Sequence, residues 1–382
     1  MVCCMATACQ LQGMSKAACG RPCTQVDPVE RAIGDVLGLG EGRTRVPESD
    51  YAPHEAILEG SLMRLGIDRS QLHGYEMLPG GRSGAATYRL RFSDRDLILK
   101  VALPGSPVHL LEGARREVLF YRHLAADVGV RVPDMIASHE DDVTGVCLLL
   151  AAHEPTPEPA AWTAARFIEA ADLLGRFHST FWGKDGDLSA MGWLRRDEES
   201  AAAASHRAAD PWQRLSTQPR FGAILAAERV AWLLRLLQLL EGFGTDATPF
   251  PVTLCHGDFH SENVLIGHDE ALVLSDWQEV GIGRGPEDLS FFIQRATFSG
   301  GKVPVEDMFE AYRQSVIAIT GQDIQLEDIR RVADLAELRT RLLDWPEFLD
   351  EAPAHQLSDM IERIEVLAYA LSGQHRRAHD RW

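Results

Sequence analysis

The sequence predicts an α+β protein with two lobes, the first rich in β-strands and the second mainly helical. Short apolar runs separated by turn residues dominate up to residue 150, whereas apolar residues at helical spacing dominate from residue 162. Prolines between these parts, at 155, 157 and 159, predict a hinge. We expect three segments: a disordered or poorly structured tail containing cysteines at 1–50, the first lobe at 51–152 and the second lobe at 153–382.

The first lobe is expected to combine a β-sheet with two helices. In the predicted helices apolar residues recur every three or four positions, whereas the predicted strands are short apolar runs between turn residues. The helices are expected at 53–66 and 110–128, and the strands at 75–78, 86–92, 97–101, 134–138 and 145–150.

The second lobe is expected to be helical with one interruption. Residues 252–276 have the pattern of a hairpin of apolar strands, and residues 201–204 that of a short helix or linker. The helices are expected at 162–182, 223–241, 306–319, 326–350 and 356–372.

The net charge of −18 at pH 7 argues against a nucleic-acid partner, because the chain has no excess of Lys and Arg to neutralise phosphates. This charge is compatible with a cationic small substrate, although acidic surfaces also serve solubility alone. The sequence contains no run of eighteen apolar residues, so we expect no membrane partner. Five of the seven cysteines lie in the tail without paired metal-site spacing, while Cys147 and Cys255 fit reduced core positions. We expect a cytoplasmic protein.

The segment 255–277 carries most of the functional signal. His256, Asp258 and Asn263 form the pattern H-x-D-x-x-x-x-N, and an apolar strand then leads to Asp276. Phosphoryl transfer from ATP needs such groups: one Asp orients or deprotonates the attacking hydroxyl, and an Asn and a second Asp hold Mg²⁺ against the phosphate oxygens. The Asp-to-Asn spacing also matches the protein-kinase catalytic loop. The pattern predicts an ATP-dependent kinase, with a chance arrangement of turn residues as the alternative.

The first lobe offers the partners that such a kinase requires. Lys100 ends the third predicted strand, where kinases carry the Lys that contacts the α- and β-phosphates. Glu117 lies in the following helix, where it can pair with Lys100, although alone it would fit a solvated helix position. The Gly-rich turn at 80–84 lies between the first two strands, and its backbone N–H groups suit phosphate oxygens, but it does not spell G-x-G-x-x-G.

Over roughly residues 55–375 the chain resembles the aminoglycoside phosphotransferase and choline-kinase-like family, including its ecdysteroid-kinase-like members. The resemblance implies a protein-kinase-like fold, ATP and Mg²⁺ as cofactors, and a small-molecule hydroxyl as acceptor. The resemblance rests on motifs that identify the superfamily but do not identify a substrate. These are GGRSGAATYR at 80–89, ILK at 98–100, LGRFHSTFW at 174–182, CHGDFHSENVL at 255–265 and SDWQ at 275–278.

The resemblance also implies roles for individual residues. Asp258 would be the catalytic Asp, and Asn263 and Asp276 the Mg²⁺ ligands. His256 would be a structural member of the catalytic loop, and Asp288 the buried Asp that braces this loop, with a charge at a helix N-terminus as the equal alternative for Asp288. The expected nucleotide-binding residues are Lys100 with Glu117 for the phosphates, Gly81, Ser83 and Gly84 in the Gly-rich turn, and Ala151 and His153 near the adenine.

Two other functions remain to be distinguished. A protein kinase needs a long segment after its Mg²⁺-binding Asp to dock a peptide, but here a Gly-rich turn after Asp276 leads directly into the helix of Asp288. A nucleotide-binding protein without catalysis is the second alternative, although every catalytic position is occupied. The acceptor stays open among aminoglycosides, amino alcohols, sugars and secondary metabolites. Acidic candidates such as Asp344 and Asp350 cannot be separated from ordinary surface charge.

Overall fold

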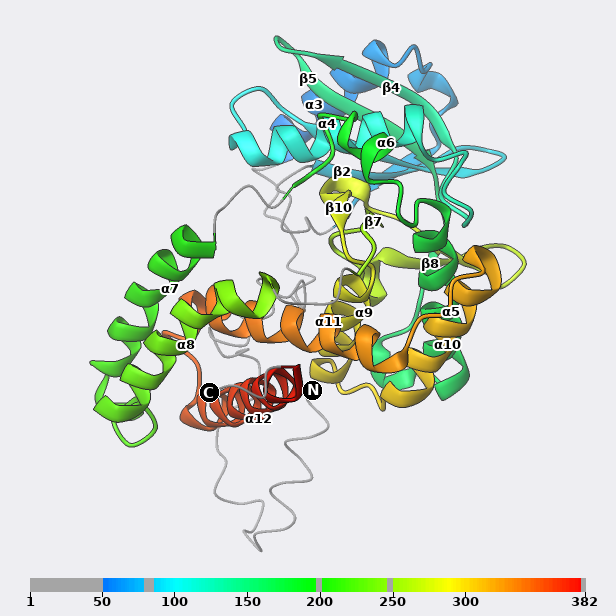
Figure 1. Cartoon of the computed structure of the whole chain (residues 1–382). Helices are drawn as coiled ribbons and strands as arrows, with labels where there is room; N and C mark the ends of the chain where they lie inside the picture. Colours follow the sequence, from blue (N-terminus) through cyan, green and yellow to red (C-terminus); the bar gives the residue numbers. More distant parts are fainter. Residues whose placement is uncertain (1–50, 79–85, 197–200, 246–249, 379–382) are drawn as a thin grey trace, which may run out of the picture.

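A computed structural model shows a β-rich lobe above a helical lobe (Figure 1). The predicted tail at 1–50 and the turn residues Gly81, Ser83 and Gly84 lie outside the part of the chain that the structure describes. The described residues are 51–78, 86–196, 201–245 and 250–378.

The N-terminal lobe contains an antiparallel sheet of five strands in the order β1-β2-β3-β5-β4. Its central position belongs to β3, which pairs with β2 and β5 through a continuous register. All five strands match predicted strands to within a few residues. They are β1 (Gly74–Met77), β2 (Ala86–Arg91), β3 (Asp96–Ala102), β4 (Met135–Asp141) and β5 (Gly145–Ala151).

Two helices pack beside this sheet. Side chains that alternate along β3 point towards one helix or the other. Leu97, Leu99 and Val101 point into an apolar cluster with α3 (Tyr51–Arg64), because alternate side chains of a strand share one face. Lys100 therefore points the other way, towards α4 (Val108–His123). The alternation of side chains along β3 thus places Lys100 on the side of α4.

Helix α4 is shorter than the predicted helix at 110–128. The helix ends at His123, and Leu124 forms its C-cap. Gly129 then adopts a positive φ of 69°, and a side chain there would come within 2.7 Å of the Thr180 hydroxyl. The chain therefore turns into a loop that packs closely against the C-terminal lobe.

The C-terminal lobe is built from helices around a small β-structure. Strands β6 (Glu154–Pro155), β8 (Val264–Ile266) and β9 (Leu272–Leu274) form one sheet, and β7 (Thr253–Cys255) pairs with β10 (Gly281–Gly283). The helices are α5 (Ala164–Thr180), α6 (Asp185–Ser189), α7 (Ala201–Ser216), α8 (Ala227–Thr245), α9 (Pro286–Phe298), α10 (Val305–Thr320), α11 (Leu326–Arg339) and α12 (Ala354–Ala378).

Several predicted helix bounds in this lobe are wrong. Helix α8 lies four residues later than the predicted 223–241, and α12 extends six residues beyond the predicted end at 372. Residues 201–204 are not a short helix or linker but the first turn of α7, which continues through Pro211 because Trp212 and Leu215 are buried against α8 and its neighbours. The helix predicted at 326–350 ends at Arg339. A π-helical turn at 340–344 and a 3₁₀ turn at 345–348 follow, and Pro346 has no N–H with which to resume the α-helical hydrogen bonds.

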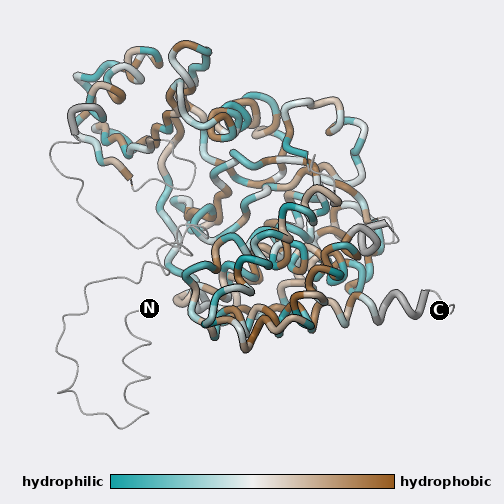
Figure 2. Tube along the Cα trace, turned by 90° about the vertical axis from the view of Figure 1, so that its left-hand side faces the viewer, coloured by the Kyte–Doolittle hydropathy of each residue, from teal (hydrophilic) through white to brown (hydrophobic). Residues whose placement is uncertain are grey.

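Two apolar cores stabilise the C-terminal lobe. One lies among α7, α8, α11 and α12, and the other joins α5, α9 and α10 to the strands that carry the H-x-D motif. Apolar and polar residues alternate along these helices, as expected of amphipathic elements that bury one face (Figure 2). Cys147 and Cys255 are buried free thiols, as predicted. Among the described residues, every helix is too short or too polar to cross a bilayer.

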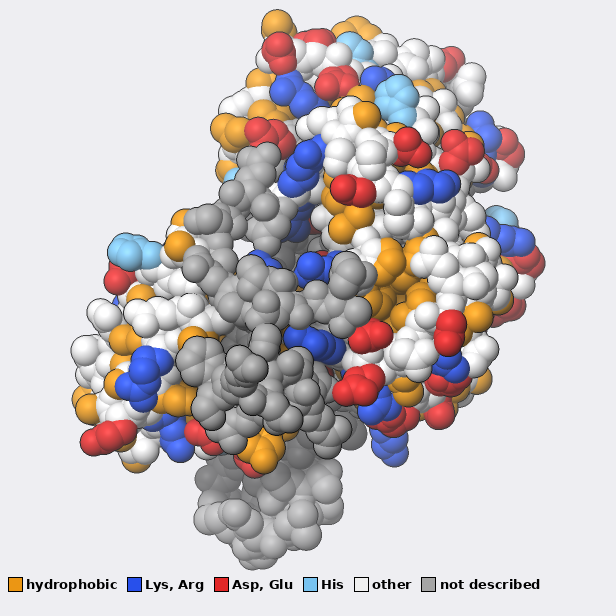
Figure 3. All heavy atoms as spheres, viewed as in Figure 1, with side chains coloured by type: hydrophobic (Ala, Val, Ile, Leu, Met, Phe, Trp, Pro, Cys, Tyr) orange, Lys and Arg blue, Asp and Glu red, His pale blue; other side chains and the backbone are white. Residues whose placement is uncertain are grey.

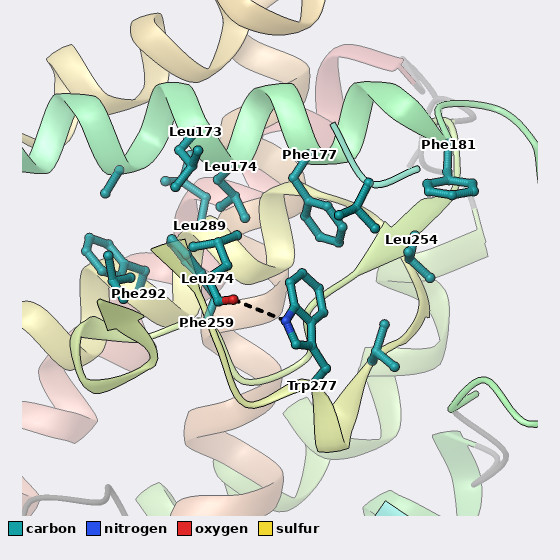
Figure 4. Close-up of a cluster of buried hydrophobic side chains, with 14 of the residues drawn as sticks. Leu173, Leu174, Phe177, Phe181, Leu254, Phe259, Leu274, Trp277, Leu289 and Phe292 are labelled. Carbon is teal, nitrogen blue, oxygen red and sulfur yellow. Dashed lines mark hydrogen bonds between the residues drawn. The ribbon is translucent and has the colours of Figure 1, made fainter. Parts of the chain in front are cut away.

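Trp277 lies at the centre of the second core, next to Asp276 (Figure 4). Its indole is fully buried, stacks on Phe120 at 4.0 Å and meets Phe177 edge-on at 5.2 Å. The indole N–H donates to the Leu274 carbonyl oxygen at 3.2 Å. Because Phe120 belongs to α4, this aromatic contact joins the two lobes directly behind the motif residues.

We predict that Trp277→Ala lowers the free energy of unfolding by about 3 to 5 kcal/mol, the usual cost of deleting a buried aromatic ring. Urea denaturation checks this value. Tyr369→Ala is the control, because the Tyr369 ring is 82% exposed on α12 and its loss should change stability by less than about 0.5 kcal/mol. Equal effects of the two substitutions would contradict the assigned role of Trp277.

Candidate active site

An ammonium group shared by two carboxylates joins the lobes. Lys100 Nζ lies 2.8 Å from Glu117 Oε1 and 2.8 Å from Asp276 Oδ1. Lys100 comes from β3 and Glu117 from α4, whereas Asp276 follows β9 in the C-terminal lobe. The structure therefore brings together three residues that the sequence predicted to act on one nucleotide.

Burial and charge act against each other in this group. Burial opposes the positive charge of Lys100, but Asp276 and Glu117 outweigh it and raise the pKa of the ammonium above its usual value. Burial likewise raises the pKa of the Glu117 carboxyl, and the Lys100 charge counters this rise. The Glu117 side chain is only 1% exposed, so its charge depends on Lys100.

Glu117 also holds the backbone beyond Asp276. It accepts hydrogen bonds from the Trp277 backbone N–H at 3.3 Å and from Gln278 Nε2 at 3.5 Å. Asp276 itself has a left-handed backbone with φ 64°, which is uncommon for a residue other than glycine. This conformation ends β9 sharply and aims the carboxylate at Lys100.

The loop that follows β7 is braced by a carboxylate from α9. Asp288 accepts hydrogen bonds from the backbone N–H groups of His256 at 2.6 Å and Gly257 at 3.0 Å. The buried His256 ring lies 2.9 Å from the Ser275 carbonyl oxygen. Gly257 has φ 81°, and a side chain there would overlap the Glu279 backbone, so only glycine fits. His256 and Asp288 thus occupy the supporting positions that the sequence suggested.

Asp288 has further buried partners that the sequence did not reveal. It lies 3.1 Å from His178 Nε2, and His178 Nδ1 lies 3.0 Å from the Tyr312 hydroxyl. His178, Cys255 and Asp288 come close enough to suggest a metal site. Both ring nitrogens of His178 and the Asp288 carboxylate already have hydrogen-bond partners, however. Hydrogen bonding within the C-terminal lobe accounts for this cluster.

Asp258 and Asn263 face each other at the start of the loop. Asn263 Nδ2 donates to the Asp258 backbone oxygen at 2.8 Å and lies 3.4 Å from Oδ2. Burial opposes ionisation of Asp258, but His260, His256 and Arg295 outweigh it and lower the pKa of the carboxyl to about 2. Asp258 is therefore ionised at neutral pH, with its side chain 37% exposed.

His260 and Arg295 support Asp258 but were not predicted. His260 Nε2 lies 3.5 Å from Asp258 Oδ2 and 3.1 Å from Asn263 Nδ2, and its Nδ1 lies 3.4 Å from Arg295 Nη2. Arg295 comes from α9, seven positions after Asp288. Because residues seven apart share one helix face, this spacing was a signal available in the sequence.

The hinge begins at Ala151, the last residue of β5, which pairs with Leu97 of β3. The Ala151 backbone N–H donates to the Asp134 carbonyl oxygen at 2.9 Å. His153 lies beyond it, and its Nδ1 is buried without a hydrogen-bond partner among the described residues. Burial also lowers the pKa of the His153 imidazole, and His268 adds to this effect. A neutral histidine with an open polar atom thus stands beside the segment that connects the lobes.

The model of the phosphotransferase enzyme family matches residues 75–357. The chain belongs to this family. Membership confirms the predicted family and, with the fold described above, the two-lobed kinase-like α+β architecture. It also confirms the prediction of a small-molecule phosphotransferase. No curated protein sequence matches the chain.

Several solved structures have a similar fold, and this chain aligns with nearly the whole length of each. The GDP complex of aminoglycoside 2'-phosphotransferase-IIIa is 13% identical, with a TM-score of 0.55 over 84% of this chain and 99% of that one. A microcompartment-associated aminopropanol kinase is 15% identical, with a TM-score of 0.55 over 83% and 96%. Spectinomycin phosphotransferase, in complex with ADP and spectinomycin, is 16% identical, with a TM-score of 0.51 over 83% and 98%. At these identities the likeness shows the fold alone.

The lowered pKa of Asp258 predicts a pH dependence of stability. A carboxyl whose folded pKa lies below its usual value of 3.8 stabilises the fold above that pH, and this contribution is lost as pH falls towards about 2. Asp258→Asn should therefore show a shallower fall in unfolding free energy between about pH 4 and 2 than the native chain. Urea denaturation across this range measures it. Asp359→Asn on the exposed face of α12 is the control, and a slope unchanged in Asp258→Asn would contradict the assignment.

Proposed function

We propose that this enzyme transfers the γ-phosphoryl group of ATP to a hydroxyl of a small molecule, with Mg²⁺. The observation that carries the proposal is the contact of Asp276 with the Lys100 ammonium, together with the contact of Asn263 with Asp258 in the loop before β8. Phosphoryl transfer needs charge neutralisation and positioning more than covalent chemistry, and these groups supply both.

The residues fit a Mg²⁺ site. Asn263 immediately precedes β8 and Asp276 lies two positions after the paired strand β9, and the Ser275 backbone N–H donates to the Asn263 carbonyl oxygen at 2.9 Å. Carboxylate and amide oxygens are ligands that Mg²⁺ accepts. Asn263 and Asp276 would hold the ion, which supplies positive charge to the phosphate oxygens when bound.

The N-terminal lobe would hold the nucleotide. Lys100, fixed by Glu117, would bind phosphate oxygens as a compact point charge. The adenine would lie against the backbone near Ala151 and His153, and the turn with Gly81, Ser83 and Gly84 would cover the phosphates. Lys100, Glu117 and the hinge come from β3, α4 and the end of β5, elements of one lobe, which supports a single nucleotide site. We place the reaction in the cytoplasm, where ATP is available.

Asp258 would orient the acceptor hydroxyl rather than remove its proton early. A carboxyl with a pKa of about 2 is a weak base, so proton transfer would accompany bond formation to phosphorus. Asn263 and His260 fix the carboxylate from one side, which leaves its exposed part for the hydroxyl. Most of the rate enhancement would then come from alignment of the hydroxyl with the γ-phosphate.

The geometry favours a small acceptor over a peptide. After Asp276 the chain enters β10, which pairs with β7, and α9 already begins at Pro286. This leaves no long segment to dock a peptide. Aminoglycosides, spectinomycin and an aminopropanol appear in the names of the solved structures of similar fold, and hydroxyl compounds of this size are the acceptor class we propose.

We predict that Asp258→Asn lowers kcat by at least ~100-fold, because the variant cannot accept the hydroxyl proton. ATP consumption and mass-spectrometric product analysis with a panel of aminoglycosides, amino alcohols, sugars and nucleosides check this. Affinity for ATP with Mg²⁺ should stay near that of the native chain, which shows that the fold is intact. Turnover close to normal in Asp258→Asn would contradict the proposed mechanism.

A further inference from the structure

Five arginines from different elements interact with the carboxylates of Glu279, Glu287 and Asp344. Local sequence patterns do not predict this cluster, because its members are far apart along the chain. They are Arg116 on α4, Arg195 after α6, Arg207 on α7, Arg284 after β10 and Arg339 on α11.

Arg195 is linked to the catalytic loop through Glu279. Its Nη1 is 3.0 Å from Glu279 Oε2, and its backbone bonds to Val280 and Ile282 on both sides. The backbone of Glu279 packs directly against Gly257, the residue before Asp258. The Arg195 side chain is 54% exposed, so it remains accessible to a ligand while hydrogen bonds fix the backbone of this residue.

Arg116 adds a second positive charge at the same position. It donates to the backbone oxygens of Trp193, at 3.3 Å, and Gln278. Burial lowers the pKa of its guanidinium, and the charge of Arg195 contributes to this, whereas Glu279 and Glu112 oppose it. Arg116 and Arg195 are therefore near neighbours with like charge.

The other three arginines surround two carboxylates. Glu287, in the first turn of α9, accepts a hydrogen bond from the Arg284 backbone N–H at 3.2 Å and interacts electrostatically with Arg284 and Arg339. Asp344 lies 3.7 Å from Arg207 and interacts with Arg339 and Arg195 as well. Figure 3 shows Lys and Arg side chains gathered in the hollow between the N-terminal lobe and the α7–α8 region.

Two of the acidic candidates of this lobe, Asp344 and Asp350, are already paired with arginine. Arg207 also lies 3.9 Å from Glu347, and Arg214 pairs with Asp350 at 2.9 Å. Glu262, four positions after Asp258 in the loop, lies 3.9 Å from Arg295. These arginines offset the negative charge that would attract a cationic acceptor. An anionic acceptor can bind beside them, because a guanidinium has five N–H donors and one carboxylate uses at most two of them.

Resting on the proposed function, we infer that the acceptor carries an anionic group, a carboxylate or a phosphate, which Arg195 and Arg284 bind while its hydroxyl meets Asp258. The positive charge of this proposed site is local and opposite in sign to the net charge of the chain, which is −18. It separates this chain from an enzyme for aminoglycosides, whose amino groups are cationic.

The test compares four compounds with one pyranose skeleton and different charge. Binding of D-glucuronate, D-glucose 6-phosphate, D-glucose and D-glucosamine to the protein with ADP and Mg²⁺ is measured by calorimetry. We expect at least tenfold tighter binding of glucuronate or glucose 6-phosphate than of glucose, and the weakest binding of glucosamine. The two anions distinguish a carboxylate from a phosphate site. No preference for either anion, or a preference for glucosamine, would overturn the inference.

Arg195→Gln and Arg284→Gln locate the site. Each should weaken binding of the preferred anion at least tenfold and leave the affinities for glucose and for ADP with Mg²⁺ unchanged. Arg69→Gln is the matched control, because Arg69 pairs with Glu55 on the surface of the N-terminal lobe. An equal effect of Arg69→Gln would overturn the inference. Anion binding without any phosphorylated product would contradict the proposed function instead and leave the assigned anion site standing.

Discussion

The ammonium of Lys100 connects the two halves of this enzyme, and most of the site depends on it. Glu117 is buried to a degree that a carboxylate tolerates only beside a positive charge, and Lys100 is the charge that it contacts. The same ammonium reaches Asp276 in the other lobe. Loss of Lys100 would leave the two carboxylates without their shared positive charge, so this one ammonium holds β3, α4 and the end of β9 together at the junction of the lobes.

Beneath this junction, aromatic packing and a buried carboxylate hold the remaining parts. Trp277 stacks on Phe120 of α4 and thereby fixes the chain next to Asp276. Asp288 holds the backbone of His256 and Gly257, which sets the start of the catalytic loop. The neighbours of Asp258 keep its carboxyl ionised, which suits the role in positioning a hydroxyl that we propose for it.

Local sequence patterns predicted what local structure determines. The H-x-D-x-x-x-x-N spacing, the strand that ends in Lys100 and the helix of Glu117 each lie within one element, and the structure brings their residues together. Helix α7 was predicted only as a short helix or linker at 201–204, because its continuation through Pro211 depends on tertiary burial of Trp212 rather than on a local signal. The contacts of His260 with Arg295, and the arginines around Glu279 and Asp344, join segments that no periodicity relates.

The affinity of Lys100→Met for ATP and for adenosine tests the central claim most directly. The account predicts that ATP binds at least ~10-fold more weakly while adenosine binds as in the native chain, because Lys100 contacts phosphate and not the base. Lys302→Met, at an exposed position, should bind both ligands normally. Unchanged ATP affinity in Lys100→Met would contradict the claim that the shared ammonium marks the phosphate site.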